Sequence, residues 1–581
     1  MITRLMLRLL PVQVLLAAVG AVNGLVSGYF ASNYVGVDAM SAVGLYSPAN
    51  MLVTSIGTIL VGGAAIICGK YLGQNEQKKL QGTFSLVMLL AAGIGILFTV
   101  LFLAMGAFDL TGFFTKDETL RPIFNRYLMG QAIGVLPLVL GAQLAPFLAM
   151  ENRPRRTFAA SIVYIITNLI LNVVFVMVLD MQEMGVALSS SIGMWVFMGV
   201  QAQYFLTKRS SLKFTVKDLP FREIRPVFVI GFPGAATNLY QTLRGIIVNK
   251  LLITYAGSVG LPAFSAAGSV LGIFWAIPGG MIAVSRLLLS VSVGEEDRQT
   301  IADIMRVMMR VFIPIMLAVI GLIIVFSDPL SSVFFRDSEP EVHELMQTGL
   351  RILPFCMALS IFTMHFNCYS QLMGRQVLVN VLAVLDGVVC VSAFSALLTP
   401  GMGVTGVYVA NVLNGIVICL CFIGYSWVRG KAFPNNMEKL LAIPEGFGVP
   451  PEERLDLSVR TSEEVVRVAE QVQHFARSRG IDERRAYYAA LAMEEMAGNI
   501  VEHGFTKDKK RHSVDVRVIH KDDSVMLRIK DDCVPFDPEA RTKILAGDDP
   551  AKNIGIRMIY RMIRDISYQN LLGLNVLSMK I

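Results

Sequence analysis

Three side chains near the C-terminus, Glu495, Asn499 and His503, follow one another at a spacing of four residues, and Gly504 comes next. On a helix, residues at i, i+4 and i+8 lie on roughly one face, so these side chains can act together. Glu495 is placed as a single carboxylate base that could take a proton during phosphoryl transfer. The motif indicates a nucleotide-type site.

A second set of candidates lies within apolar sequence, where ionisable side chains are costly and tend to face a cavity or a partner. Asp386 is the acidic residue most clearly embedded in such a stretch, residues 377–389. We predict that it carries a coupling or substrate-binding charge; a structural ion pair is the competing interpretation. Partners or counter-charges could come from Arg244, Asn249, Lys250, Arg286 and His365. For Lys250 and Arg286, snorkelling of the long side chains to headgroups is the favoured interpretation.

Long apolar runs surround these candidates, and each is near or above the ~20 residues needed to cross about 30 Å of hydrocarbon. The chain is 54% hydrophobic and 16% charged, which is far from a soluble protein and implies a lipid bilayer as its surroundings. About twelve spans are expected, at residues 9–31, 43–69, 83–107, 127–149, 157–179, 185–207, 226–254, 261–291, 306–326, 348–372, 376–398 and 404–428. The predicted body is a polytopic all-α membrane protein, with its first run retained as a helix rather than cleaved as a signal peptide.

Lysine and arginine gather in alternate loops, after the second, fourth and sixth runs. Cation-rich short loops are retained in the cytoplasm, so both termini are predicted to be cytoplasmic, in a multi-pass protein of the cell membrane. The same bias accounts for the net charge of +7, and no nucleic-acid partner is expected.

The spans contain an internal duplication. Gly36 and Gly257 end matching tripeptides 221 residues apart, and the segments that begin at Gly73 and Gly294 match at the same offset. Farther along, the tripeptides around residues 185 and 403 match at an offset of 218, which places Asp386 opposite Asn168. Two six-helix lobes in one orientation, residues 1–220 and 221–430, are therefore predicted, with a substrate path between them.

Residues 1–430 resemble the multidrug and toxic compound extrusion (MATE) family. The resemblance rests on Gly-Leu-Val-Ser-Gly-Tyr-Phe at residues 24–30, Met-Ser-Ala-Val-Gly-Leu-Tyr-Ser-Pro at 40–48 and Gly-Phe-Pro at 231–233. It implies export of organic, often cationic, compounds in exchange for Na⁺ or H⁺ by alternating access. Where many members carry an acidic residue in the first span, this chain has Ser27, which can hydrogen-bond a cation but cannot carry a proton.

The composition changes after residue 430. Residues 431–455 are linker-like, and a cytoplasmic domain is predicted at 456–581. Ser462 is expected to cap a helix to about residue 479, and Asp482 one to residue 503. Strands are expected at 512–520 and 524–531, a helix at 554–564, and a hairpin at 566–569 and 575–580. This order predicts an α/β two-layer sandwich.

The domain resembles the histidine-kinase-like ATPase fold in the form found in anti-sigma-factor serine kinases. The matches are the Glu495, Asn499 and His503 helix, the segment 531–538, and Asn-Ile-Gly-Ile-Arg-Met at 553–558. The resemblance implies ATP, with Glu495 as catalytic base and Asn499 holding Mg²⁺ between the phosphates. It also implies that Asp531 accepts a hydrogen bond from the adenine amino group, and that Phe536 and Gly555 belong to the nucleotide site.

Two departures from that pattern weaken catalysis more than binding. Cys533 and Asn553 stand where the family has glycine, so a Cβ could intrude on the ligand. A surface carboxylate is the alternative for Glu495, next to Glu494, and a helix-end cap is the alternative for His503.

Three functions remain open on these observations. The leading one is an antiporter for multidrug efflux whose ATP-binding domain senses nucleotide or, as a serine/threonine kinase, phosphorylates a cytoplasmic regulatory protein. The second is a membrane-anchored partner-switching regulator with a degenerate transporter body. The third is a flippase for lipids or lipid-linked precursors. No P-loop is present, because Gly69-Lys70 is followed by Tyr71, so ATP is not expected to drive transport as a motor.

Overall fold

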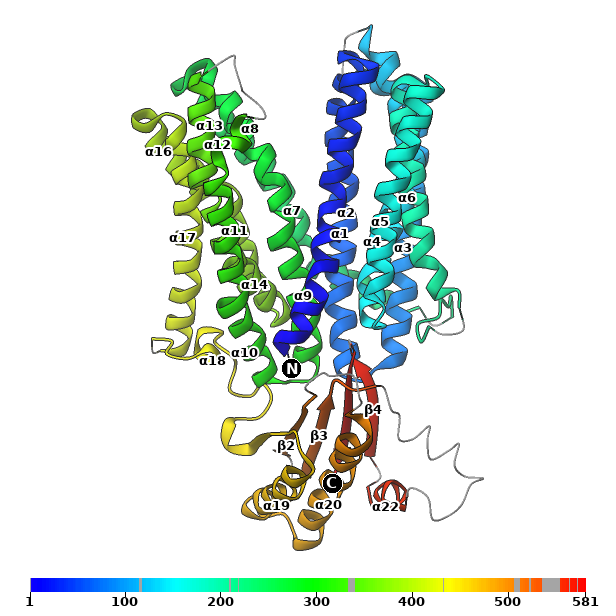
Figure 1. Ribbon diagram of the computed structural model, residues 1–581, viewed down its shortest axis with the longest axis vertical. Helices are drawn as coiled ribbons and strands as arrows, with labels where there is room; N and C mark the ends of the chain where they lie inside the picture. The colour runs from blue at the N-terminus through cyan, green and yellow to red at the C-terminus, as the bar shows by residue number, and fades with distance from the viewer. Residues whose placement is uncertain are drawn as a thin grey trace.

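The computed structural model describes residues 2–581 apart from 114–117, 208–209, 218, 333–339, 432, 506–511, 522–523, 535–553, 564 and 572. Two bundles of long helices stand side by side, and a small α/β domain lies across one end of both (Figure 1). We term this the domain-side end. The N-terminus lies there too.

The first bundle contains the spans predicted for the first lobe. Its elements are α1 Ile2–Phe30, η1 Ala31–Val35, α2 Val37–Gly73, α3 Gln77–Ala107, η2 Leu110–Phe113, α4 Leu120–Met150, α5 Pro154–Asn172, η3 Val173–Val178 and α6 Gln182–Phe205. η1 and η3 are π-helical turns that continue α1 and α5. Turns of this kind recur at functional sites.

The second bundle repeats this order of helices. Its elements are η4 Phe221–Glu223, α7 Ile224–Tyr255, α8 Gly257–Phe274, α9 Ala276–Gly294, α10 Arg298–Val307, η5 Met308–Phe312, α11 Ile313–Val325, α12 Ser327–Ser332, α13 Pro340–Ile352, α14 Phe355–Leu372, α15 Gln376–Val384, η6 Leu385–Val389, α16 Cys390–Met402 and α17 Val404–Gly430. Gly73 and Gly294, 221 residues apart, end α2 and α9 respectively, as the predicted duplication requires.

By length and apolar composition, 11 helical segments among the described residues can cross a membrane, close to the twelve expected. The remaining predicted span is α7, a helix of 32 residues. Its sequence includes Asn238, Gln241, Arg244 and Asn249, which lower its mean hydropathy. α7 still packs against α2 and η6, so its polar content reflects contact with protein rather than lipid alone.

Glycines let the two bundles meet at the domain-side end. A Cβ added at Gly73 would overlap a backbone carbonyl oxygen of α9, and one at Gly294 would overlap a carbonyl oxygen of α2. Gly63 and Gly231 make similar approaches between α2 and α7. Figure 1 shows the bundles diverging from this contact toward the opposite end. The lobes are therefore closed against each other on the side of the α/β domain.

The C-terminal domain is built around one antiparallel sheet of order β1-β2-β3-β5-β4. After α18 Met437–Leu440 and η7 Pro451–Glu453, its elements are β1 Arg454–Val459, α19 Ser462–Ser478, α20 Glu483–Asn499, η8 Ile500–Gly504, β2 Val514–Lys521, β3 Ser524–Asp531, α22 Ile554–Met562, β4 Asp565–Leu571 and β5 Leu574–Lys580. Strand β1 was not predicted, although Leu455, Leu457 and Val459 alternate with polar residues as in a half-buried strand.

Side-chain caps begin the two long helices of this domain. Asp482 accepts a hydrogen bond from the Arg485 amide at 3.0 Å, as predicted for the start of α20. For α19 the predicted cap, Ser462, is wrong by one residue. The cap is Thr461, whose hydroxyl accepts from the Glu464 amide at 3.4 Å.

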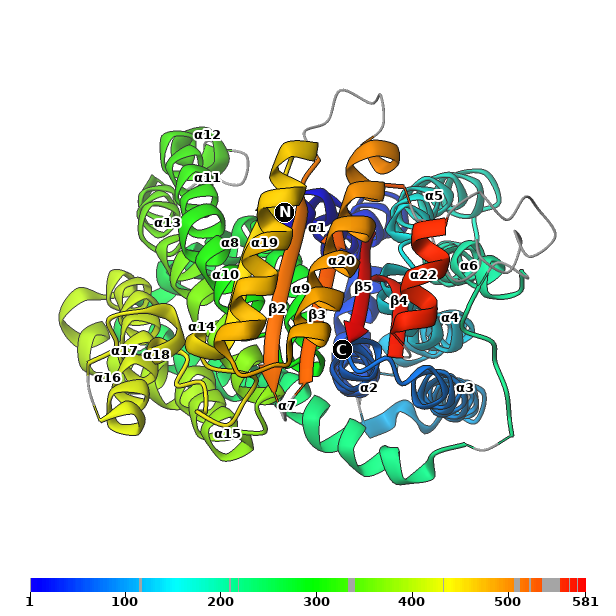
Figure 2. The same ribbon diagram turned by 90° about the horizontal axis from the view of Figure 1, so that it is seen from below.

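The sheet separates two different surfaces. Seen from below, α19, α20 and α22 cover one face, and the helix bundles lie behind the other (Figure 2). The helix-covered face contributes Val514, Val516, Val518, Val525, Leu527 and Ile529 to the domain core. The opposite face bears Arg517, Arg528 and Lys530 and contacts the bundles. A two-layer sandwich with one layer of helices is thus present, as predicted, and its second face is docked.

Candidate functional site

Glu495 and Asn499 lie together on α20, one turn apart. The Asn499 Nδ2 donates to Glu495 Oε1 at 2.8 Å and to the Glu495 backbone oxygen at 2.7 Å. Both side chains are half-buried, whereas Glu494 is exposed. The fold therefore distinguishes the two adjacent carboxylates, and Glu495 is the one turned toward the rest of the site.

His503 lies apart from this pair. It is part of η8, where the helix widens to a π-helical turn, so the four-residue spacing no longer keeps it on the face of Glu495. Its side chain is exposed, and no polar contact in the described part of the chain joins it to Glu495 or Asn499. The geometry favours the helix-end position over a shared site.

Gly555, the second residue of α22, lies against the Glu495 carboxylate. A Cβ built on Gly555 would overlap both carboxylate oxygens, so a larger residue there would require the flexible Glu495 side chain to shift. A helix N-terminus presents free amide groups and a positive dipole end, which attract anions. The Glu495 carboxylate occupies this position, where the resemblance to ATPases expects a phosphate.

Asp531 ends β3 with its side chain buried. Its Oδ1 accepts hydrogen bonds from the Cys533 amide at 2.9 Å and from Asn575 Nδ2 at 2.7 Å. Burial raises the pKa of the Asp531 carboxyl, and these two hydrogen bonds offset the increase only in part. The carboxylate is thus held as an acceptor beside the loop that follows β3.

These residues fit Mg²⁺ and a nucleotide at three points. Both Asn499 hydrogen bonds use Nδ2, so the amide oxygen is left as a metal ligand. Gly555 has no Cβ beside the α22 N-terminus, so a ligand can approach the backbone amides there once the Glu495 carboxylate moves away. Asp531 offers a buried acceptor for an amino group. Phe536 and Asn553 lie outside the described residues.

Asp386 lies in η6, a π-helical turn in the fifth transmembrane segment of the second lobe. Its Oδ1 accepts from Asn414 Nδ2 of α17 at 2.7 Å, and the carboxylate is half-buried. The hydrogen bond leaves Oδ2 for a proton or a cation. A Cβ added at Gly387 would press on the Tyr240 side chain of α7, so this turn also packs closely against α7.

The two α7 candidates lie at different distances from Asp386. Arg244, one turn beyond Tyr240, interacts electrostatically with the Asp386 carboxylate. Asn249 is exposed and lies nine residues beyond Tyr240, or about 14 Å along the helix axis. The structure thus groups Arg244, but not Asn249, with Asp386.

Ser27 and Asn168 meet through Ser190, a residue that the sequence did not single out. Ser190 Oγ lies 3.1 Å from Ser27 Oγ, accepts from Asn168 Nδ2 at 3.4 Å and donates to Asn23 Oδ1 at 3.1 Å. All four groups are neutral. Three of them, Asn23, Ser27 and Ser190, line a cavity of about 290 Å³, which is also lined by Tyr46, Asn50, Thr54, Tyr127 and Gln131.

Two hydrogen-bond partners of the candidate residues, Ser190 and Asn414, were missed in the sequence. Both lie in the last helix of their lobes and contact a residue of the preceding segment. A weak signal existed, because three consecutive serines, 189–191, interrupt one apolar span and two asparagines, Asn411 and Asn414, interrupt another. Polar residues in such spans seek partners on neighbouring helices.

Family models match both parts of the chain. One described as MatE matches residues 15–174 and 233–395, more than half of the chain. One described as Histidine kinase-like ATPase domain matches residues 459–581. The two MatE segments fall in the two helix bundles, in keeping with the internal duplication.

One curated relative and two solved structures extend this comparison. The chain is 22% identical over 238 residues to the multidrug export protein MepA of Staphylococcus saprophyticus, covering 40% of this chain and 52% of that protein. The match thus spans about half the length of this relative. An outward-facing MATE family multidrug resistance transporter of the MOP superfamily has a TM-score of 0.68 at 19% identity, covering 75% of this chain and 96% of that one. A MOP superfamily transporter from Pyrococcus furiosus, described as having a binding pocket of reverse polarity, gives the same values. At this identity the structures show a shared fold.

Proposed function

The chain belongs to the MatE family and ends in a histidine kinase-like ATPase domain, and from this premise we propose that it exports organic compounds across the cell membrane. Export proceeds by alternating access of the two lobes, in exchange for Na⁺ or H⁺. The glycine contacts between α2, α7 and α9 support this mechanism, since they provide a closed gate on one side. By the distribution of cations in the loops, that side is the cytoplasm.

The placement of Asp386 is the observation that carries the coupling assignment. In the first lobe, the groups around Ser27 and Ser190 are neutral and bonded to one another. In the second lobe, Asp386 supplies a carboxylate with one oxygen bonded to a neutral amide. A carboxylate in this setting can exchange a proton or bind a cation, whereas hydroxyl and amide groups cannot change charge.

Transport in sealed vesicles tests this proposal. Purified protein is reconstituted, and efflux of an organic cation such as ethidium is followed under an imposed Na⁺ gradient or an imposed pH gradient, with and without ATP. Export driven by one of the two gradients is expected. Absence of transport under both gradients would contradict the exporter assignment.

The C-terminal domain is proposed to bind ATP with Mg²⁺ and to regulate the transporter or phosphorylate a protein hydroxyl. Asn499 would hold the metal, Asp531 would accept from the adenine amino group, and Glu495 would take the proton of the acceptor hydroxyl. Bound Mg²⁺ would neutralise phosphate charge. Because Glu495 contacts Gly555, its carboxylate must move aside before a phosphate can approach the α22 N-terminus.

Glu495→Gln separates binding from chemistry. The variant should retain Mg²⁺-dependent stabilisation of the full chain by ATP, because glutamine keeps the size of the side chain, and it should lose phosphorylation of any serine- or threonine-bearing partner. Exposed Glu494→Gln is the matched control. ATP consumption in proportion to substrate moved, lost in Glu495→Gln, would instead show that the domain powers transport.

A further inference from the structure

An acidic loop of the second lobe binds the basic face of the sheet. The loop between α9 and α10 contains Glu295, Glu296 and Asp297. Glu295 pairs with Lys530 at 2.8 Å and lies 3.6 Å from Arg528, and Glu296 lies 3.5 Å from Lys521. Glu295 is almost fully buried in this contact. These ion pairs fix strands β2 and β3 to the second lobe.

Asp297 is the most buried acid of this loop, with its side chain 1% exposed. It pairs with Arg517 and, at 3.4 Å, with Lys530, and it also accepts from the Thr300 amide at 2.8 Å as the N-cap of α10. Burial alone would raise the pKa of Asp297, but the Arg517 and Lys530 cations hold that pKa well below its usual range. Removing one partner of such a buried pair by mutation leaves an uncompensated buried charge, so substitution of Asp297 or Arg517 should disrupt this contact strongly.

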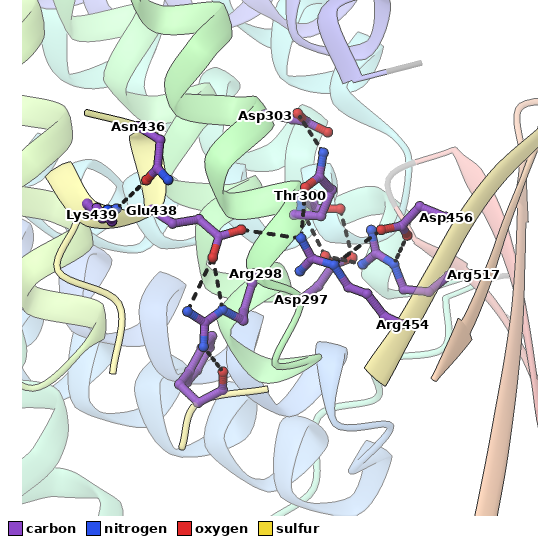
Figure 3. A network of polar contacts seen from close by, with 12 residues as sticks. Asp297, Arg298, Thr300, Asp303, Asn436, Glu438, Lys439, Arg454, Asp456 and Arg517 are labelled. Atoms are coloured by element: carbon purple, nitrogen blue, oxygen red, sulfur yellow. Dashed lines mark hydrogen bonds and ion pairs between the residues drawn. The ribbon is translucent and has the colours of Figure 1, made fainter. Parts of the chain in front are cut away.

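The connection after α17 strengthens the attachment to the same lobe (Figure 3). Glu438 of α18 forms ion pairs with Arg298 of α10 at 3.2 Å and with Arg454 of β1 at 3.3 Å. Arg454 also donates to Gln299 of α10 at 3.2 Å. The linker, the start of α10 and the first strand thus form one polar network, and the domain is anchored to the second lobe.

Two polar contacts join the domain to the first lobe, at the end of the sheet where β3 and β4 finish. Arg4 of α1 pairs with Asp532 at 3.1 Å, but the Arg4 side chain is 58% exposed. Asn152, between α4 and α5, donates to Asn570 of β4 at 3.4 Å. Exposed ion pairs and long neutral hydrogen bonds contribute little, so these contacts can be broken and reformed.

The first-lobe contacts adjoin the proposed adenine-binding carboxylate. Asn575 donates to Asp531 Oδ1 at 2.7 Å, and its own Oδ1 accepts from Asn570 Nδ2 at 2.8 Å. Asn570 in turn meets Asn152. A chain of side-chain hydrogen bonds therefore runs from Asp531 to the first lobe, and Asp532, the partner of Arg4, is the next residue in sequence.

We propose that the C-terminal domain is anchored to the second lobe and that its adenine-binding edge is a latch for the first lobe, which holds the cytoplasmic gate closed. The latch consists of Arg4, Asn152, Asn570 and Asp532. The latch engages only when the domain-side ends of the two lobes are in contact, because the rigid sheet of the C-terminal domain must contact both lobes at once. This inference rests on the ATP-binding role proposed above.

Nucleotide binding releases the latch by competition for Asp531. An adenine amino group donates to this carboxylate and displaces Asn575, which then no longer orients Asn570 toward Asn152. The ion pairs of the acidic loop are not part of this chain and persist. ATP therefore loosens the first lobe from the domain while the second lobe stays attached.

Hydrogen–deuterium exchange of the full chain in lipid nanodiscs tests the latch. Mg²⁺ and saturating ATP should raise exchange in residues 149–156 and at the start of α1 by threefold or more, and leave residues 294–300 unchanged. GTP is the matched control, because guanine has no amino group at the position of the adenine amino group. Equal increases at both lobes, or none at either lobe although ATP is bound, would overturn the proposal.

Variants test the latch without nucleotide. Arg4→Ala should reproduce the first-lobe increase, whereas Arg8→Ala, an exposed arginine one turn along α1 that forms no ion pair among the described residues, should not. Arg517→Glu should raise exchange at both lobes, since it breaks the anchor. If ATP fails to bind in the same samples, the nucleotide site is wrong, and the latch then stands or falls on the difference between Arg4→Ala and Arg8→Ala.

Discussion

At the scale of residues, the two lobes place different chemistry in equivalent helices. The fifth and sixth segments of the first lobe are joined by Asn168 and Ser190, and those of the second by Asp386 and Asn414. The pairs have similar polarity, but only the second can change its charge. The titratable member of these two pairs therefore lies in the second lobe.

Asp386→Asn should abolish gradient-driven efflux, because an amide cannot exchange a proton or neutralise a cation. Asparagine preserves the side-chain size and the contact with Asn414, so the protein should fold. Efflux from vesicles measures the effect, and Asp180→Asn, at an exposed loop position, is the control. Undiminished transport by Asp386→Asn would remove this residue from the mechanism.

ATP affinity should weaken on acidification, and the loss should begin at a pH above the ordinary aspartate pKa of about 3.9. The cause is the raised pKa of Asp531, since the protonated carboxyl is a poor acceptor for the adenine amino group. Below its folded-state pKa, affinity should fall by up to about tenfold per pH unit. Titration calorimetry of the full chain measures this, and in Asp531→Asn the slope should vanish.

At the scale of elements, the ends of α2 and α9 determine how the lobes close. Gly73 and Gly294 occupy equivalent positions, and each lies against the backbone of the other helix. Backbone cannot move aside as a side chain can, so even a methyl group forces these helix ends apart. The closed gate therefore depends on the absence of a Cβ atom at both Gly73 and Gly294.

Gly73→Ala should therefore weaken the closed gate. Cys68, fully buried one turn before the end of α2, should become several-fold more reactive toward N-ethylmaleimide, as measured by mass spectrometry of peptides. Gly93→Ala is the control, because a Cβ at Gly93 would meet nothing within 4 Å. Equal labelling of Cys68 in both variants would contradict the role of Gly73.

Elements were more predictable than the contacts between them. Periodicity and capping residues located α20, β3 and the membrane helices, because these signals are local. The π-helical turns at η6 and η8 were not predicted, since a single inserted residue hardly alters an apolar pattern. Asp297 and Arg517 are 220 residues apart, and no local signal connects them. In the sequence, the acidic loop was recognised only as the repeat counterpart of residues 73–76, and its contact with the sheet was not predicted.

At the scale of the molecule, we propose that the C-terminal domain moves as part of the second lobe. Its acidic-loop contacts are buried and ionic, whereas the Arg4–Asp532 ion pair with the first lobe is partly exposed. Movement of the lobes should therefore carry the nucleotide site with α10 and α17. The proposed latch therefore acts on the relative position of the lobes, not on the substrate cavity.

Deletion of residues after 430 should leave ion-driven transport intact and remove its response to ATP. The membrane body retains Asp386 and the glycine contacts, while the latch is lost. Vesicle efflux with and without internal Mg·ATP measures both effects, with the Glu495→Gln full chain as a control that keeps the domain. Loss of all transport from a well-folded truncated protein would show that the domain is needed for export itself.

The acidic loop between α9 and α10 breaks the symmetry of the duplicated body. The two helix-end loops are related by the internal repeat, so an attached domain would otherwise have two nearly equivalent orientations, half a turn apart. The first-lobe loop, Gly-Gln-Asn-Glu, contains one acidic residue, whereas the second-lobe loop, Gly-Glu-Glu-Asp, contains three. Only one orientation brings the basic sheet over the three acids. The two lobes of the duplicated body therefore differ at their domain-side ends. This difference gives the C-terminal domain one fixed docking position, from which nucleotide binding can act.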